Sequence, residues 1–233
     1  METWTGQRPP RRRGAPDLAQ VVDAGVRIAD AEGLPAVSMR RIATELRSGT
    51  ASLYRILESR EELLDHMVDA VLGSALPPAA SGDWRHDLAG VARNRRSLLH
   101  CHAWLGGQLA GRPALGPNAL RHHESALAAT AALTDDPTIA GSVVEVVFAY
   151  VLGAVARELA AGEAARRTGR SEEAWRAGVG PYLRRVLDSG EYPHLSRTVR
   201  EAADLDADAR FEWGLARVLD GVAAAGVVRR DAS

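Results

Sequence analysis

Lysine is absent from the 233-residue sequence, so every one of its 29 basic side chains is an arginine. Codon usage in a GC-rich genome accounts for that choice, and it leaves the chain with planar, forked cations that suit phosphate groups and guanine edges. Cysteine is nearly absent too, because Cys101 is the single one. One cysteine excludes an intrachain disulfide framework and favours a reducing compartment.

The sequence is also expected to lack a membrane segment. No stretch is expected to approach the roughly 20 apolar residues of a membrane span. The N-terminus is charged, but no apolar core of a signal peptide follows it. Together with the cysteine content, these features predict a cytoplasmic protein that has no membrane partner.

Aromatic residues make up only 5% of the chain, whereas apolar residues make up 46%. Alanine and leucine dominate, β-branched residues come in short clusters, and the periodic apolar runs are long, which favours helices. No alternating strand pattern and no internal repeat competes with this interpretation. The fold class is therefore predicted to be all-α.

Charge is unevenly distributed along the chain. Residues 1–60 hold ten arginines against seven acidic residues, a net charge of +3, and residues 61–233 hold nineteen against twenty-three, a net charge of −4. A basic N-terminal segment followed by an acidic remainder indicates a polyanionic partner that binds only near the N-terminus. Residues 1–16, rich in proline, arginine and glycine, are predicted to form a flexible basic arm.

Three helices are predicted after this arm, over residues 17–32, 39–46 and 50–57. Asp17 is expected to cap the first helix and Gly33 to end it, and Ser38 is expected to cap the second helix. The tight turn Arg47-Ser48-Gly49 separates the two short helices. A long helix followed by two helices of about eight residues with a tight turn between them is the helix-turn-helix arrangement.

The second short helix must hold one face on the protein and present the other to the major groove. The residues that support it are apolar, namely Met39, Ile42, Ala43, Leu46 and Leu53. The residues left to point outward are Thr50, Ala51, Ser52, Tyr54 and Arg55. Small hydroxyls and a methyl group approach base edges closely, and a tyrosine hydroxyl and an arginine hold phosphates. This face predicts a double-stranded DNA partner.

The remainder of the chain also has a helical pattern. Ser59, with Glu62 three residues later, predicts a capping box for a fourth helix that reaches about residue 76. After a linker, helices are expected over residues 84–100, 104–110, 118–133, 138–161 and 207–225. The polar segment 162–206 is expected to be broken at Gly180-Pro181 and Tyr192-Pro193. The last two helices carry more apolar surface than one monomer core needs, which predicts a homodimer.

These segments together resemble the tetracycline repressor family. In residues 18–73 the likeness rests on SMRRIATEL, TASLYRIL and SREELLDHMV, and later on HAWL (102–105), AGRPALGPNALRH (110–122), YPHL (192–195) and FEWGLARVLDGV (211–222). The combination is specific, whereas each piece alone is weak. It implies an N-terminal three-helix helix-turn-helix DNA-binding domain over residues 17–60. It also implies a larger C-terminal helical ligand-binding and dimerisation domain over residues 61–233.

The resemblance assigns DNA contacts residue by residue. The positions that match the family's base-reading residues are Arg40, Thr50, Ala51 and Ser52, and those that match its phosphate-holding residues are Tyr54 and Arg60. Charge alone adds Arg55 and Arg41, for which the alternative is a solvated helix face.

Two positions depart from the family pattern. Arg47-Ser48 stands where the family has glycine and then an apolar residue, and a positive φ at Arg47 would cost about 1 kcal/mol. Ile56 stands where a phosphate-contacting histidine is common. These departures predict a DNA-binding domain that is less stable than usual for the family or that binds an operator of unusual sequence.

The resemblance further implies a ligand cavity among the helices after the linker. The candidates for its lining are His66, Met67, Trp104, Gln108, Glu124, Val147 and Tyr150. Such a cavity is mostly apolar with a few polar groups, and ordinary core packing is the alternative for each residue. No cofactor and no metal are expected, because neither the His100/His102 pair nor the adjacent His122-His123 pair has the spacing of a helical chelate.

The implied function is a ligand-responsive transcriptional repressor that binds a palindromic operator as a dimer and is released by a small-molecule effector. Ligand entry is expected to shift the fourth helix through contacts near His66 and Met67. An enzyme is the alternative from another class, but no nucleophile elbow, phosphate loop, Cys/His pair or metal-spaced carboxylates occur. An activator or a ligand-insensitive architectural DNA-binding protein stays open, and the residues do not identify the effector.

Overall fold

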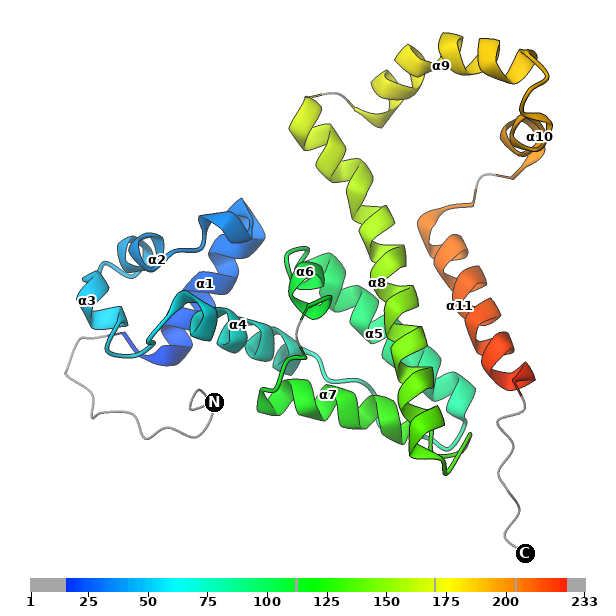
Figure 1. Ribbon diagram of the computed structural model, residues 1–233. Helices are drawn as coiled ribbons and strands as arrows, with labels where there is room; N and C mark the ends of the chain where they lie inside the picture. The colour runs from blue at the N-terminus through cyan, green and yellow to red at the C-terminus, as the bar shows by residue number, and fades with distance from the viewer. Residues whose placement is uncertain (1–15, 112, 170, 204, 226–233) are drawn as a thin grey trace, which may run out of the picture.

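The computed structural model describes residues 16–111, 113–169, 171–203 and 205–225, and every regular element within these ranges is helical (Figure 1). The all-α prediction is therefore confirmed. Apart from Pro16, the predicted basic arm over residues 1–16 lies outside the described residues.

The N-terminal head consists of α1 (Leu18–Glu32), the 3-10 turn η1 (Leu34–Ala36), α2 (Met39–Glu45) and α3 (Thr50–Leu53). Asp17 caps α1, because its side chain accepts a hydrogen bond from the backbone nitrogen of Gln20 at 2.8 Å. α3 is shorter than the helix predicted over residues 50–57. The chain tightens after it into turn hydrogen bonds from the nitrogens of Ile56 and Leu57 to the Leu53 carbonyl.

α4 (Arg60–Ser74) connects the head to the rest of the chain. The Ser59 hydroxyl accepts from the nitrogen of Glu62 at 3.0 Å, as predicted. The Glu62 carboxylate, however, accepts from the nitrogen of Glu58 at 2.6 Å and not from that of Ser59, so only half of the predicted capping box forms. α4 packs on α1 and on a helix of the larger C-terminal part, so the domain boundary at residue 60 stays a prediction.

The C-terminal part, for which the sequence predicts ligand binding, is called the sensor below. It contains α5 (Trp84–Cys101), α6 (Leu105–Leu109), α7 (Pro117–Ala128), α8 (Pro137–Thr168), α9 (Glu172–Asp188), α10 (Pro193–Glu201) and α11 (Ala207–Ala224). α8 packs on α5, α7 and α11, and α7 packs on α4. α7, α8 and α10 each begin at a proline, since the first helical position needs no backbone donor. α7 ends before the predicted residue 133, where the chain turns through hydrogen bonds such as Leu133 to Thr130.

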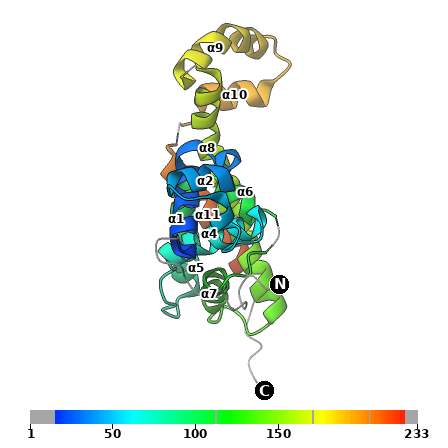
Figure 2. The same ribbon diagram turned by 90° about the vertical axis from the view of Figure 1, so that its left-hand side faces the viewer.

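The expected break at Gly180-Pro181 does not occur. α9 runs through Pro181, because one missing backbone donor leaves the flanking hydrogen bonds of a 17-residue helix in place. The expected interruption at Tyr192-Pro193 is where α10 begins. Both views show the upper end of α8, with α9 and α10, extending beyond the rest of the molecule (Figures 1 and 2).

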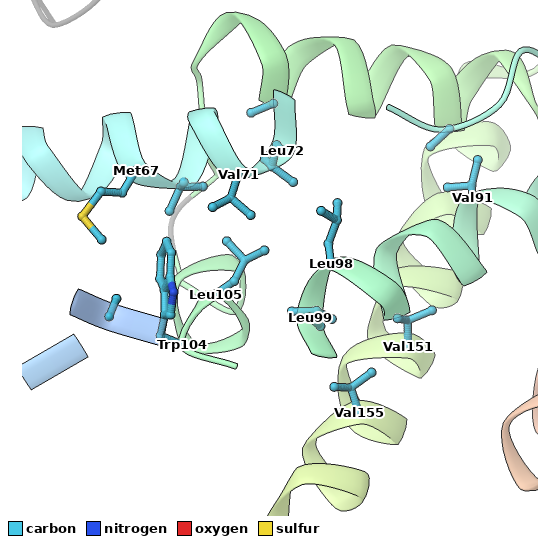
Figure 3. Packing of buried hydrophobic residues seen from close by; sticks show 14 of the residues in the cluster. Met67, Val71, Leu72, Val91, Leu98, Leu99, Trp104, Leu105, Val151 and Val155 are labelled. Atoms are coloured by element: carbon cyan, nitrogen blue, oxygen red, sulfur yellow. The ribbon is translucent and has the colours of Figure 1, made fainter. Parts of the chain in front are cut away.

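The core runs from the head through α4 into the sensor. Figure 3 shows apolar side chains that project inward from α4, α5, α6 and α8, including Met67, Leu99, Leu105 and Val151. One expectation is wrong here: within α8, the stretch Pro137–Ala160 is long and apolar enough to cross a membrane. An 18-residue window of this stretch has a mean hydropathy of 2.1, and only 28% of that window is buried. Valine and alanine side chains produce most of this hydropathy, and burial in the core accounts for only part of the window.

Candidate DNA-binding head and effector site

The turn between α2 and α3 is a helix C-cap with an arginine in the position that glycine usually occupies. Arg47 has φ +49° and is the only non-glycine residue with positive φ among the described residues. Its nitrogen donates to the Thr44 carbonyl at 3.2 Å, and the nitrogen of Ser48 donates to the Ala43 carbonyl at 2.9 Å. This is the Schellman pattern, which satisfies two carbonyls at the end of α2. The positive φ considered for Arg47 in the sequence analysis occurs in the structure.

This turn aims the exposed residues of α3 away from the head. Leu53 is fully buried and holds α3 on the core, whereas the Tyr54 side chain is 57% exposed. Thr50, Ala51 and Arg55 are exposed as well, Ser52 is half-buried, and Arg40 on α2 is exposed. The Arg55 guanidinium donates to the Ser52 hydroxyl at 3.0 Å. The predicted DNA-contacting residues of α2 and α3 therefore remain accessible to a partner.

Two other arginines that were predicted to contact phosphate are engaged within the head. Arg60 donates from Nε to the Val37 carbonyl at 3.0 Å and from Nη2 to the Leu34 carbonyl at 3.1 Å. Arg41 pairs with Glu32 at 2.6 Å and Glu45 at 2.9 Å, and hydrogen bonds to Glu32 and then Glu45 raise its pKa. Both side chains stabilise the head, and sequence alone did not reveal these partners.

The predicted effector residues fall into three groups. His66, Met67, Trp104 and Val147 are buried, and Met67 and Trp104 are among the inward-facing side chains of Figure 3. Gln108 on α6 is half-buried. Glu124 is exposed on α7, so the structure does not bring its side chain into the interior with the others.

Tyr150 of α8 contacts α11. Its hydroxyl donates to the Phe211 carbonyl at 2.8 Å, and the two ring centroids lie 5.6 Å apart. A Cβ atom at Gly214 would lie 2.3 Å from the Tyr150 hydroxyl oxygen, so glycine permits the contact. Burial is the main cause that raises the pKa of this phenol. Tyr150 thus joins α8 to α11 and is not grouped with the residues of α4 and α6.

A polar contact between head and sensor was missed by sequence reasoning. The Asp30 carboxylate in α1 accepts a hydrogen bond from Trp104 Nε1 at 2.7 Å, and His102 Nδ1 lies 2.9 Å from the same oxygen. We call these three side chains the Asp30 junction. No local signal reveals it, because Asp30 and Trp104 are separated by 74 residues along the chain.

A second polar contact joins α4 to α7. The buried Asp69 carboxylate accepts from the backbone nitrogens of Asn118 at 2.8 Å and Ala119 at 3.0 Å, at the N-terminus of α7. An acid at this end of a helix satisfies free donors and complements the helix dipole. A movement of α4 would therefore be transmitted to α7.

A pocket of about 640 Å³ lies beside the Asp30 junction. It is lined by Ala19, Gln20, Val22, Asp23, Val26, Ala70, Val71, Ser74 and His102. The volume suits a small molecule, and none of the seven predicted effector residues lines the pocket. The described residues contain no group of three or more His, Cys, Asp or Glu side chains that could hold a metal ion.

Comparison with known proteins identifies the family. Residues 76–225 match the model of the tetracyclin repressor-like C-terminal domain. The chain is 41% identical over 225 residues to the HTH-type transcriptional repressor DrrR1 of Streptomyces coeruleorubidus, with 94% of this chain and 82% of that protein covered. The Escherichia coli class A tetracycline repressor from transposon 1721 is 28% identical over 225 residues, with 91% and 92% covered.

A solved structure extends this likeness to the whole fold. ActR of Streptomyces coelicolor, a TetR family protein solved in complex with actinorhodin, superposes with a TM-score of 0.74 at 29% identity, covering 90% of this chain and 96% of ActR. The family model matches more than half of the sequence, and DrrR1 matches nearly all of it. The chain therefore belongs to the tetracycline repressor family of helix-turn-helix transcriptional regulators.

Proposed function

We propose that this chain is a cytoplasmic repressor that binds a palindromic DNA operator as a homodimer and is released by a small-molecule effector. The observation that carries the proposal is the exposed surface of α2 and α3, on which Arg40 and Tyr54 stay accessible while Leu53 fixes α3 to the core. A recognition helix needs this division between a buried and a free face. The names of the curated relatives, which are transcriptional repressors and regulators, support the same role.

The exposed faces of α8 and α11 support dimerisation. Val146 and Trp213 are 52% and 62% exposed, although both lie on helices that also contribute to the core. The exposed positions of α8 include the small residues Ala149, Gly153 and Ala156, which allow a second helix to approach closely. In a two-fold dimer, two recognition helices would address two half-sites of a palindrome.

Release requires movement to pass from the sensor to the head, and α4 has the contacts for it. Met67 of α4 packs against Gly25 of α1 so closely that a Cβ atom at Gly25 would lie 2.8 Å from the Met67 sulfur. Asp69 holds α7 two residues further along α4. A ligand that displaces α4 near His66 and Met67 would therefore move α1, provided that it prefers one state by about 1–3 kcal/mol.

The decisive experiment is selection of bound DNA from a random pool, followed by gel-shift titration at physiological salt. The Arg40→Ala, Tyr54→Phe double variant is expected to bind the selected palindrome at least about ten-fold more weakly, since base and phosphate contacts contribute about 1–3 kcal/mol each. Arg121→Ala, on the exposed face of α7, is the matched control and should bind as the unmodified protein does. Wild-type affinity in the double variant, with an unchanged dimer in gel filtration, would contradict the assignment.

Activation in place of repression depends on where the operator lies. A footprint over the promoter, together with effector-dependent release, supports repression. A footprint upstream of the promoter with ligand-independent binding would support the activator alternative.

A further inference from the structure

Arg95 is a half-buried cation in the sensor, and no acidic side chain among the described residues pairs with it. It lies on the inward face of α5, three to four residues from the buried Val91, Ala92, Leu98 and Leu99. Its Nε atom is closed to solvent and has no hydrogen-bond partner. Its guanidinium carbon lies 3.9 Å from the centroid of the Phe148 ring of α8. Burial lowers the pKa of Arg95 to about 10.

The neighbouring arginines of α5, unlike Arg95, each form ion pairs with acidic side chains. Arg93 pairs with Glu212 at 2.7 Å, and Arg96 pairs with Glu158 at 3.0 Å and with Asp208 at 2.8 Å. In the part of the chain that the structure describes, Arg95 has no such acidic partner. A guanidinium does not lose its proton, so removing it from water without a counter-ion is unfavourable. Core residues that retain such a charge are candidates for binding an opposite charge.

The groups around Arg95 leave its donors free. Phe148 covers one face of the guanidinium, so the N–H groups at the edge of the guanidinium remain available as hydrogen-bond donors. The nearby His122 of α7 is buried, and its Nε2 lies 2.6 Å from the Leu72 carbonyl oxygen. An imidazole ring is neutral or cationic, and burial first and the charge of Arg95 second lower the pKa of His122, so this ring is not a counter-ion for Arg95. The donors of Arg95 fit a carboxylate, which accepts two parallel hydrogen bonds from a guanidinium.

We propose that Arg95 is the anion-binding group of the effector site and that the effector of this chain carries a carboxylate or a comparably acidic group on an apolar body. The inference rests on the proposed function, because it assigns the effector its chemical class. Val147, Phe148 and Leu98 supply the apolar surroundings. Since the Arg95 side chain is partly exposed, a ligand has a route to it.

The first arm of the test needs no effector. Arg95→Met keeps a long apolar side chain but removes the charge, so its melting temperature in carboxylate-free buffer should rise by about 2 °C or more. Arg93→Gln, which breaks an exposed ion pair on the same helix, should change the melting temperature by less. A lower melting temperature for Arg95→Met would mean that protein groups already compensate the charge, and it would overturn the proposal.

The second arm measures the ligand class with matched probes. By titration calorimetry, naphthalene-2-carboxylate should bind the unmodified dimer at least ten-fold more tightly than the neutral naphthalene-2-carboxamide. Arg95→Met should lose this discrimination, and Arg93→Gln should keep it. Equal binding of acid and amide, including no detectable binding of either, would overturn the proposal, as would discrimination that survives in Arg95→Met.

Both arms are read without DNA, so they separate the anion site from the repressor role. Acid discrimination in a protein that selects no DNA would leave the anion site standing and contradict the proposed function. DNA selection without acid discrimination would contradict the anion site alone.

Discussion

The Asp30 carboxylate of α1 accepts a hydrogen bond from the indole nitrogen of Trp104 at 2.7 Å, and this bond crosses from head to sensor. Trp104 is buried and immediately precedes α6, while Asp30 lies in the last turn of α1. The same carboxylate lies beside His102. A tilt of the head against the sensor would have to lengthen these bonds, so they oppose such a tilt.

Asp30→Asn and Trp104→Phe should show strong energetic coupling. Trp104→Phe removes the donor of the hydrogen bond, whereas Asp30→Asn keeps an acceptor oxygen but removes its charge, so each single variant should lose about 1–3 kcal/mol of unfolding free energy. The double variant should lose less than the sum of the two, with a coupling of about 0.5–3 kcal/mol in urea unfolding. As a control, Asp23→Asn on the exposed face of α1 should be additive with Trp104→Phe. Additivity of the Asp30 pair would show that the contact contributes little.

Arg47→Gly and Arg47→Ala should differ in stability although neither residue carries a charge. Arg47 has φ +49°, which glycine adopts freely and alanine does not. Arg47→Gly is expected to be more stable than Arg47→Ala by about 1 kcal/mol, measured as unfolding free energy in urea. Equal stability of the two variants would mean that the turn relaxes to negative φ.

Asp69→Ala should destabilise the protein by about 1–3 kcal/mol, because it leaves the buried nitrogens of Asn118 and Ala119 without an acceptor. The control is Asp65→Ala, an exposed acid one turn earlier in the same helix, whose unfolding free energy should change by less than about 0.5 kcal/mol. Thermal and urea unfolding measure both variants. Equal losses for the two acids would contradict the role of Asp69 at the start of α7.

Asp87 should make the stability of the sensor depend on acid pH. It accepts from the Ser81 hydroxyl at 2.7 Å and from the Ser81 nitrogen at 2.9 Å, and the hydroxyl bond is the main cause that lowers its pKa below 3.8. A carboxyl whose pKa is lower in the folded state stabilises the fold above its unfolded pKa, and this contribution is lost as the pH falls through the folded value. Asp87→Asn should therefore melt below the unmodified protein at pH 7, with a gap that narrows below pH 3.8. A gap that is constant between pH 7 and pH 2 would contradict this role.

Local chemistry in the sequence predicted most helix boundaries. Asp17, Ser38 and Ser59 all cap helices, since a short polar side chain before an apolar period binds the free nitrogens of the first turn. The prolines were harder to interpret. Pro117 and Pro137 begin their helices, whereas Pro181 lies inside one, and the same residue type is compatible with both positions.

Contacts between distant helices could not be predicted in this way. Tyr150 lies three residues after Val147 in α8, and both were predicted to line the effector cavity. α8 is surrounded by several helices, so its apolar side chains are divided between them and Tyr150 contacts α11. The bonds of Arg60 to the Val37 and Leu34 carbonyls likewise depend on how η1 returns to α4, which no local pattern encodes.

The single cysteine lies beside the Asp30 junction and provides a site for chemical labelling. Cys101 is exposed at the last position of α5, directly before His102 of the Asp30 junction. A thiol-reactive fluorophore or nitroxide would therefore label one site per chain without prior mutagenesis, next to the contact that links head and sensor. In a dimer the two labels would form one spin pair, and its dipolar distance before and after effector addition would report movement of the two α5 ends relative to each other, beside the Asp30 junctions.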